Sequence, residues 1–255
     1  MCLILFAYDM HPHYRLVLAA NRDEFYDRPA APLHFWEDYP EILAGRDLKL
    51  LGTWLGVTRD GRLAAITNFR DPGGIKQVAP SRGDLVADYL KGGRGPDDYL
   101  QEIGAGADAY NGFNLLVGNR DGLYYASNRG DWFRSLQPGI YGLSNHLLDT
   151  PWPKVRSGVT HLKTLMAAPE AALLSGLEEL LQNQGRPPDD QLPDTGVGLE
   201  WERRLASIFI SSRAYGTRCT SIVTIARTGQ IRFKEISWAQ GLERPSPAAV
   251  REFNC

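Results

Sequence analysis

Three times along this chain, two β-rich segments flank a short turn that ends in glycine, and this repeated pattern constrains the fold most. The paired segments are residues 53–59 and 62–68 across Asp60-Gly61, 113–119 and 123–127 across Asp121-Gly122, and 221–226 and 230–238 across Thr228-Gly229. Because Asp-Gly favours the two positive φ angles of a type I′ turn, we predict that turn at Asp60-Gly61. Residues 2–8 and 15–20 form a fourth predicted hairpin across His11-Pro12-His13. Four hairpins are enough for two antiparallel sheets.

Helical segments lie between the hairpins. Ser81 is a suitable N-cap for a helix over residues 82–91, and Gly92-Gly93 follows as its stop. Three further helices are predicted over residues 96–103, 154–168 and 170–183, followed by a surface loop over 184–198. Antiparallel sheets with a few helices predict an α+β layered fold. The continuous apolar run over residues 2–7 predicts a strand covered on both faces, in the middle of a layered sandwich.

Composition limits the class of protein. With 255 residues, of which 43% are hydrophobic and 23% charged, we expect a single domain over residues 1–255. A net charge of −2 predicts no nucleic-acid partner. The three cysteines, at positions 2, 219 and 255, give neither a disulfide framework nor zinc-site spacing, which favours a reducing compartment.

The start of the chain does not resemble a signal peptide, because its apolar stretch is short and has no basic segment before it. No other segment reaches the roughly 18 apolar residues that a membrane span needs. We therefore expect a soluble, cytoplasmic protein without stable membrane insertion.

Cys2 directly follows the initiator methionine. If aminopeptidase removes Met1, as the small cysteine side chain favours, the protein begins with a thiol beside a free α-amine. The amine has an ordinary pKa of about 7.7 to 8.0, which suits a general base at neutral pH, and an adjacent base activates a thiol nucleophile. The alternative interpretation of Cys2 is a buried strand cysteine without a chemical role.

A polar quartet, Asn21-Arg22-Asp23-Glu24, follows the buried run of residues 16–20 at the end of the second predicted strand. Together with Ala20, Phe25 and Arg28-Pro29, the quartet resembles the signature of the NRDE family, also called the transport and Golgi organisation protein 2 family. Further segments that resemble this family, in the same order, are Gly52-Thr53-Trp54-Leu55-Gly56, Ile66-Thr67-Asn68-Phe69-Arg70, Ser81-Arg82-Gly83, Asn111-Gly112-Phe113-Asn114-Leu115, Gly142-Leu143-Ser144-Asn145 and Pro151-Trp152-Pro153-Lys154. The resemblance therefore extends through most of the chain.

This resemblance implies the fold of the N-terminal nucleophile hydrolases, a four-layer αββα sandwich of two antiparallel sheets, in agreement with the α+β layers predicted above. The cysteine branch of that superfamily includes penicillin V acylase and bile-salt hydrolases. It cleaves non-peptide amides with an N-terminal cysteine, an arginine, an aspartate and two asparagines. Carried over to this sequence, the resemblance makes Cys2 the nucleophile and Asp23 the carboxylate that orients its α-amine. It also makes Asn145 and Asn68 candidate oxyanion donors, and Arg218 the late arginine.

The early arginine departs from the pattern of those hydrolases. There it stands a few residues before the aspartate, whereas Arg22 is adjacent to Asp23. Neighbouring residues of a strand point to opposite faces. Either Arg22 or Asp23 therefore faces away from the predicted cleft between the sheets, unless the chain bulges or turns there.

The resulting hypothesis is hydrolysis of a non-peptide amide (C–N) bond in a small, partly apolar substrate, a reaction that requires no cofactor. Members of the family have also been linked to haem mobilisation and to lipid or acyl-group homeostasis. The resemblance therefore implies an alternative, the non-catalytic binding and intracellular transfer of haem, acyl-CoA or a lipid, with Cys2, His146 or neither as the haem ligand. A purely structural role is the third hypothesis. The sequence predicts no metal site and leaves the oligomeric state open.

The candidate residues also have structural interpretations. Arg22 and Asp23 are, on this view, part of an ion-pair cluster that closes the strand end. Asn145 is a turn residue, and Arg218 hydrogen-bonds loop carbonyls. Its neighbour Cys219 is interpreted as an inert core thiol. These alternatives predict the same strands and helices and differ from the functional interpretation only in the chemistry of the side chains.

Overall fold

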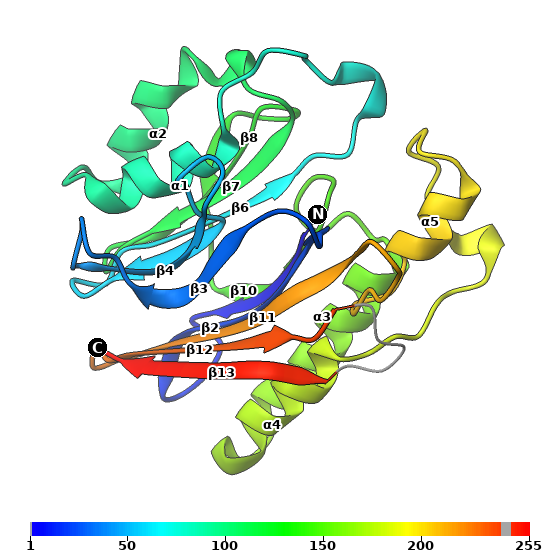
Figure 1. Ribbon diagram of the computed structural model, residues 1–255. Helices are drawn as coiled ribbons and strands as arrows, with labels where there is room; N and C mark the ends of the chain where they lie inside the picture. The colour runs from blue at the N-terminus through cyan, green and yellow to red at the C-terminus, as the bar shows by residue number, and fades with distance from the viewer. Residues whose placement is uncertain (1, 241–245) are drawn as a thin grey trace. The chain divides into compact units, whose positions relative to one another are not determined.

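The computed structural model describes residues 2–240 and 246–255 (Figure 1). The chain forms two compact units. The first comprises Met1–Asp27, Pro138–Ser144 and Leu148–Cys255, and the second comprises Arg28–Gln137 and Asn145–Leu147. Each unit is built on its own antiparallel sheet, so the predicted α+β class with two antiparallel sheets is confirmed. The single domain over residues 1–255 stays a prediction.

The first unit contains a six-stranded sheet with the strand order β10-β1-β2-β11-β12-β13. Its strands are β1 (Cys2–Tyr8), β2 (Tyr14–Phe25), β10 (Gly139–Leu143), β11 (Tyr215–Ala226), β12 (Ile231–Trp238) and β13 (Pro247–Asn254). β1 is buried along its whole length and pairs with β10 on one side and with β2 on the other. The apolar run at the start of the chain therefore forms an inner strand covered on both faces, as predicted.

Two helices cover one face of this sheet. The helices of the first unit are α3 (Pro153–Met166), α4 (Glu170–Leu181) and α5 (Leu199–Leu205), with a 3₁₀ turn over Asp189–Gln191. Leu3, Leu5 and Ala7 form a buried cluster with side chains of α3 and α4, such as Leu162 and Leu177. Because side chains alternate along a strand, the other residues of β1, beginning with Cys2, point to the opposite face of the sheet.

The second unit contains a seven-stranded sheet in which neighbours follow chain order, β3-β4-β5-β6-β7-β8-β9. Its strands are β3 (Ala30–Phe35), β4 (Ile42–Asp47), β5 (Leu55–Thr58), β6 (Leu63–Asn68), β7 (Phe113–Gly118), β8 (Leu123–Ser127) and β9 (Phe133–Ser135). Every neighbouring pair is antiparallel, and the pairs β5–β6 and β7–β8 are two of the hairpins that the glycine turns predict.

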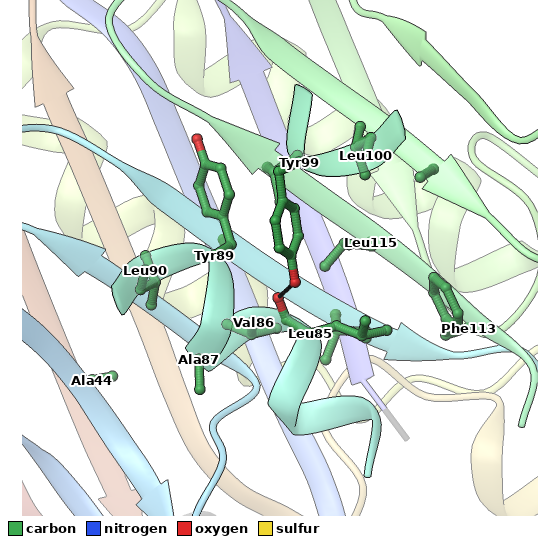
Figure 2. Packing of buried hydrophobic residues seen from close by; sticks show 14 of the residues in the cluster. Ala44, Leu85, Val86, Ala87, Tyr89, Leu90, Tyr99, Leu100, Phe113 and Leu115 are labelled. Atoms are coloured by element: carbon green, nitrogen blue, oxygen red, sulfur yellow. Dashed lines mark hydrogen bonds between the residues drawn. The ribbon is translucent and has the colours of Figure 1, made fainter. Parts of the chain in front are cut away.

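Helices α1 (Arg82–Lys91) and α2 (Pro96–Gly104) pack on one face of the second sheet, together with Ala107 of the 3₁₀ turn Ala107–Ala109. A further 3₁₀ turn is Pro72–Gly74. Figure 2 shows Tyr89 and Tyr99 standing side by side in this core. Their rings lie 5.2 Å apart between centroids, and both are buried. The hydroxyl of Tyr99 donates a hydrogen bond to Leu85 O at 2.7 Å, so its polar end is satisfied inside the core.

The glycine turns differ from the prediction in their geometry. At the first turn Gly61 has a φ of +94°, whereas Asp60 is not among the residues of positive φ, so the predicted type I′ turn is wrong. Instead, Thr58 N donates to Arg62 O at 2.9 Å across a three-residue loop in which only the glycine is left-handed. The turn at Gly229 repeats this geometry, with a φ of +95°. The hairpin predicted at Asp60-Gly61 is therefore present, but it does not use the predicted two-residue turn.

The observed bounds of the strands and helices were predicted with mixed success. The predicted helix over residues 82–91 coincides with α1, although the Ser81 side chain makes no capping hydrogen bond. The predicted strand over residues 15–20 is too short, because β2 continues through the polar quartet to Phe25, where it pairs with β11. Strands β3, β4, β9, β10 and β13 and helix α5 have no counterpart in the prediction.

Within residues 2–240 and 246–255, no helix combines the length and the apolar composition that crossing a membrane requires.

Gly52 is expected to be essential for the packing of α1. A Cβ atom there would lie 2.6 Å from the backbone carbon of Gly83, in the first turn of α1. Gly52→Ala should therefore lower the free energy of unfolding by about 1–3 kcal/mol, measured by urea denaturation, because the backbone must move to admit the methyl group. Gly93→Ala is the matched control, since a Cβ there would meet nothing within 4 Å. Equal unfolding midpoints for the two variants would contradict this account.

Candidate functional site

Cys2 begins β1 and lies opposite Arg22 of β2 in the register of the two strands. Arg22 in turn lies opposite Cys219 of β11. Residues that face each other across paired strands point to the same side of a sheet, so Cys2, Arg22 and Cys219 form one row on the face away from α3 and α4. Arg22 therefore shares a face with Cys2, which answers the question that its position next to Asp23 raised.

The electrostatic surroundings of Cys2 act in opposite directions. Burial raises the pKa of the Cys2 thiol, whose residue is only 8% exposed. The positive charge of Arg22 and a hydrogen bond from the backbone N–H of Asp23 lower that pKa, because both stabilise the thiolate. The backbone N–H of Asp23 thus contacts the sulfur, although the Asp23 side chain points elsewhere. At neutral pH, a thiol of this kind needs a base to become a nucleophile.

The carboxylate of Asp23 lies on the opposite face of the sheet from Arg22 and is buried. Its Oδ1 accepts a hydrogen bond of 2.7 Å from Thr217 Oγ1, on the partner strand β11. Burial raises the pKa of Asp23, while the charge of Lys154 and the Thr217 hydrogen bond act to lower it. Asn21, on the same face, donates to Leu181 O and Ile208 O at 2.8 and 2.9 Å. This arrangement is a buried polar cluster on the helix side of the sheet.

Arg218 lies at an irregularity of β11. Thr217 pairs with Asp23 and Cys219 pairs with Arg22, so Arg218 is an extra residue on its strand, as in a β-bulge. The bulge predicted as one option for β2 is therefore in the neighbouring strand. Arg218 Nη1 donates to Phe25 O at 2.9 Å. Burial lowers the pKa of Arg218, and the like charge of Arg22 lowers it further.

Asn68 and Asn145 belong to the second unit, where they contact each other. Asn68 is the last residue of β6, and its carbonyl oxygen accepts a hydrogen bond of 3.0 Å from Asn145 Nδ2. Asn145 is fully buried, and its own carbonyl oxygen accepts from Arg70 N at 2.7 Å. The next residue, His146, packs against Phe69 with 4.7 Å between ring centroids and the rings tilted by 38°, and burial lowers its pKa. The structure thus brings together the two predicted oxyanion donors.

The candidate residues are therefore distributed over both units. Cys2, Arg22, Asp23 and Arg218 lie in the first unit, with Asn68 and Asn145 in the second. Ser144, the residue before Asn145 in the chain, belongs to the first unit, and its hydroxyl donates to Cys2 O at 3.4 Å.

Sequence reasoning missed three residues around the site. Thr217 bonds Asp23, but their register depends on the bulge at Arg218, which no sequence pattern indicates. Glu235 accepts a hydrogen bond from the Cys219 thiol, and both are buried. Lys154 is a buried cation beneath the sheet, and the only sequence signal for it is its place in a segment that resembles the family.

Among the residues that the structure describes, no group of three or more histidine, cysteine or acidic side chains is placed to hold a metal ion.

Comparison with known proteins places the chain in a family. A sequence model of the family described as Transport and Golgi organisation 2 matches residues 1–240. The Transport and Golgi organization protein 2 homologs of Bos taurus and Homo sapiens are 38% and 37% identical over 261 residues, covering 93% of this chain and 93% of each relative. Among solved structures, the C2A mutant of conjugated bile acid hydrolase from Clostridium perfringens matches with a TM-score of 0.50 and 8% identity, covering 99% of this chain and 96% of that chain. At that identity the likeness shows the fold alone, which is that of an N-terminal nucleophile hydrolase.

The thiol of Cys2 is expected to depend on Arg22 for its reactivity. Its alkylation by iodoacetamide, followed by peptide mass spectrometry, should have a midpoint above the ordinary thiol pKa of about 8.5, because burial raises its pKa. Arg22→Gln should move the midpoint higher and slow alkylation at pH 9 by about threefold or more, since a stabilising positive charge is lost.

Arg232→Gln is the control for this experiment, because Arg232 pairs with Glu252 on the outer strands of the same sheet. An Arg22→Gln variant that is alkylated at Cys2 as fast as this control would show that Arg22 does not act on the thiol.

Proposed function

The chain belongs to the Transport and Golgi organisation 2 family and has the fold of an N-terminal nucleophile hydrolase, and on this basis we propose that it is a cysteine hydrolase of non-peptide amide bonds. Cys2 is the proposed nucleophile, and it becomes the first residue when Met1 is removed. The observation that carries this proposal is that a positive charge and a backbone hydrogen bond both stabilise the thiolate form of Cys2. Arg22 faces the same side as Cys2, and the Asp23 backbone N–H bonds its sulfur.

The proposed reaction has two stages. The Cys2 thiol gives its proton to its own α-amine, directly or through water, and the sulfur attacks the amide carbonyl carbon. Cleavage of the C–N bond sends the proton from the ammonium to the leaving nitrogen and leaves the acyl group on sulfur as a thioester. Water then gives a proton to the amine and its hydroxide attacks the thioester, which releases the acid and restores the thiol. The base is needed because burial keeps the thiol protonated at neutral pH.

The remaining candidates complete the proposal. Asp23 is assigned to orient the α-amine, and Asn145, with Asn68, is assigned to bind the oxyanion. Such donors stabilise the negative charge that develops on the carbonyl oxygen in the transition state. The hydrogen bond from Asn145 Nδ2 to Asn68 O supports this assignment, because it fixes the orientation of the Asn145 amide. Arg218 is assigned to substrate binding beside the bulge.

An aromatic cluster supports a partly apolar small-molecule substrate. Phe25, the last residue of β2, is 48% exposed. Its ring lies 5.1 Å from that of Tyr215 and 6.5 Å from that of Trp201, between centroids. Arg218 bonds the carbonyl of the same phenylalanine, so an apolar surface and a cation are adjacent. A substrate with an acyl chain and a polar amide suits this combination.

A cytoplasmic location is also part of the proposal. The three cysteines, all in the described part of the chain, form no disulfide, which agrees with a reducing compartment. The proposed partners are small molecules only, with no nucleic acid, and hydrolysis needs no cofactor.

The hydrolase proposal predicts amine release that depends on Cys2. Purified protein should lack Met1 by intact mass and should release glycine from N-acyl glycines of increasing chain length, detected with fluorescamine. Cys2→Ala should lower the rate by about 10³-fold or more, because the nucleophile is lost. Cys255→Ala should retain the rate.

Two results would overturn this proposal. One is retained Met1 in most molecules, which removes the α-amine from Cys2. The other is a panel of amide and ester substrates that the wild-type protein and Cys2→Ala hydrolyse equally slowly.

A second candidate function is the non-catalytic binding and transfer of haem, acyl-CoA or a lipid. Two observations favour it, one in each unit: the exposed Phe25 with its aromatic neighbours, and the half-buried His146, whose pKa is lowered by burial so that its imidazole is neutral. Neutral imidazole is the form that binds iron.

This carrier function predicts binding without turnover. Haem or palmitoyl-CoA at about 100 times its dissociation constant should stabilise the protein by about 2.7 kcal/mol, seen as a higher melting temperature, with wild type and Cys2→Ala equal. Phe25→Ala should weaken the effect of palmitoyl-CoA, and His146→Ala that of haem. No shift with either ligand would exclude the carrier function for these ligands and favour a structural role.

A further inference from the structure

Lys154 occupies a position that is unfavourable for a cation. It lies in the first turn of α3, where the helix dipole favours negative charge, and it is only 4% exposed. Lysine is almost never buried to this degree unless it is paired, because removing an ammonium from water costs several kcal/mol. A buried lysine at a helix N-terminus therefore indicates a compensating interaction nearby.

Hydrogen bonds connect Lys154 and the hydrogen-bond partner of Asp23 to one short backbone segment. Lys154 Nζ donates to Leu205 O at 3.0 Å, at the end of α5. A few residues later in the chain, Ile210 N donates to Thr217 Oγ1 at 2.9 Å, and the same hydroxyl donates to Asp23 Oδ1 at 2.7 Å. The short segment from Leu205 to Ile210 thus holds the lysine at one end and the threonine that bonds Asp23 at the other.

The charges facing Asp23 come from several elements. Burial raises the pKa of its carboxyl, and Lys154 of α3 is the strongest opposing influence, followed among side chains by Thr217 of β11. Glu24, the next residue of β2, raises the pKa. On β1, the Cys2 thiol also interacts with the Asp23 charge.

Both groups are buried, Lys154 bonds Leu205 O, and Thr217, the hydrogen-bond partner of Asp23, bonds Ile210 N in the same segment. From this buried cluster we propose that Lys154 is a positioning residue that keeps the Asp23 carboxylate anionic and in place. This inference rests on the proposed function in one respect, since the anionic Asp23 is the group assigned to orient the α-amine of Cys2. A neutral carboxyl would hold the amine less firmly and would leave it free to adopt other rotamers. Lys154 acts through Asp23 and need not touch substrate.

The direct test is the titration of Asp23. With ¹³C-labelled aspartate and assignment from Asp23→Asn, NMR should show the Asp23 carboxyl titrating about one pH unit or more higher in Lys154→Met than in the wild type. Lys154→Arg should restore most of the shift, because the positive charge returns. Lys163→Met, which removes an exposed lysine from the last turn of the same helix, should leave the titration unchanged. An unchanged Asp23 titration in Lys154→Met would overturn the proposal.

Stability against pH gives a second readout. A carboxyl whose folded-state pKa is raised loses its contribution to stability as pH rises through that pKa. Lys154→Met should therefore have a urea midpoint that falls more between pH 5 and pH 8 than that of the wild type, whereas in an Asp23→Asn background the same substitution should add no pH dependence. If Lys154 had only a structural role, Lys154→Met would lower the urea midpoint equally at pH 5 and at pH 8. That result would also overturn the proposal.

These measurements separate the inference from the proposed function. If the chain hydrolyses N-acyl glycines, Lys154→Met should lower kcat at least tenfold with KM nearly unchanged, because amine orientation matters after substrate binds. If no hydrolysis is found but the Asp23 titration shifts, the Lys154–Asp23 coupling stands and the proposed function fails. If hydrolysis is found and the titration does not shift, the coupling fails alone.

Discussion

The alternation of side chains along β2 is the constraint on which the candidate site depends. β2 lies between β1 and β11, so each of its residues contributes to one of the two faces of an inner strand. Arg22 consequently stands in a row with two thiols, while Asp23 enters a polar cluster beneath the helices. The peptide group between these two residues also contributes to the site, because the Asp23 N–H donates a hydrogen bond to the Cys2 sulfur. The dipeptide Arg22-Asp23 thus supplies a cation on one face of the sheet, a carboxylate on the other face and a backbone N–H that bonds the Cys2 sulfur.

Burial is the second physical theme, and it acts against charge at three candidate residues of the first unit. It raises the pKa values of Cys2 and Asp23 and lowers that of Arg218. Each group has a compensating interaction. The charge of Arg22 acts on Cys2, the charge of Lys154 and the Thr217 hydrogen bond act on Asp23, and Arg218 bonds the Phe25 carbonyl. Perturbed groups of this kind concentrate at functional sites, although structural networks perturb pKa values as well.

Much of the fold was predictable because its signals are local. The apolar run of β1, the glycine turns and the helix over Arg82–Lys91 each depend on a few consecutive residues. Strands such as β13 were missed because its residues are mostly exposed and lack an apolar alternation. The roles of Thr217 and Lys154 were missed for another reason. Both depend on partners far away in the chain, and the register that brings Thr217 to Asp23 depends on one extra residue in β11.

The segment Asn145–Leu147 gives the second unit an unusual connectivity. This unit consists of Arg28–Gln137 and these three residues, which arrive only after the chain has formed β10 in the first unit. They are integrated into the second unit, because Arg70 N donates to Asn145 O, Asn114 Nδ2 donates to His146 O, and the Phe69 ring packs against that of His146. The second unit is thus not a contiguous insertion that could be exchanged between homologues as a single piece. Any recombination that moves residues 28–137 without residues 145–147 would separate backbone and ring contacts that belong together.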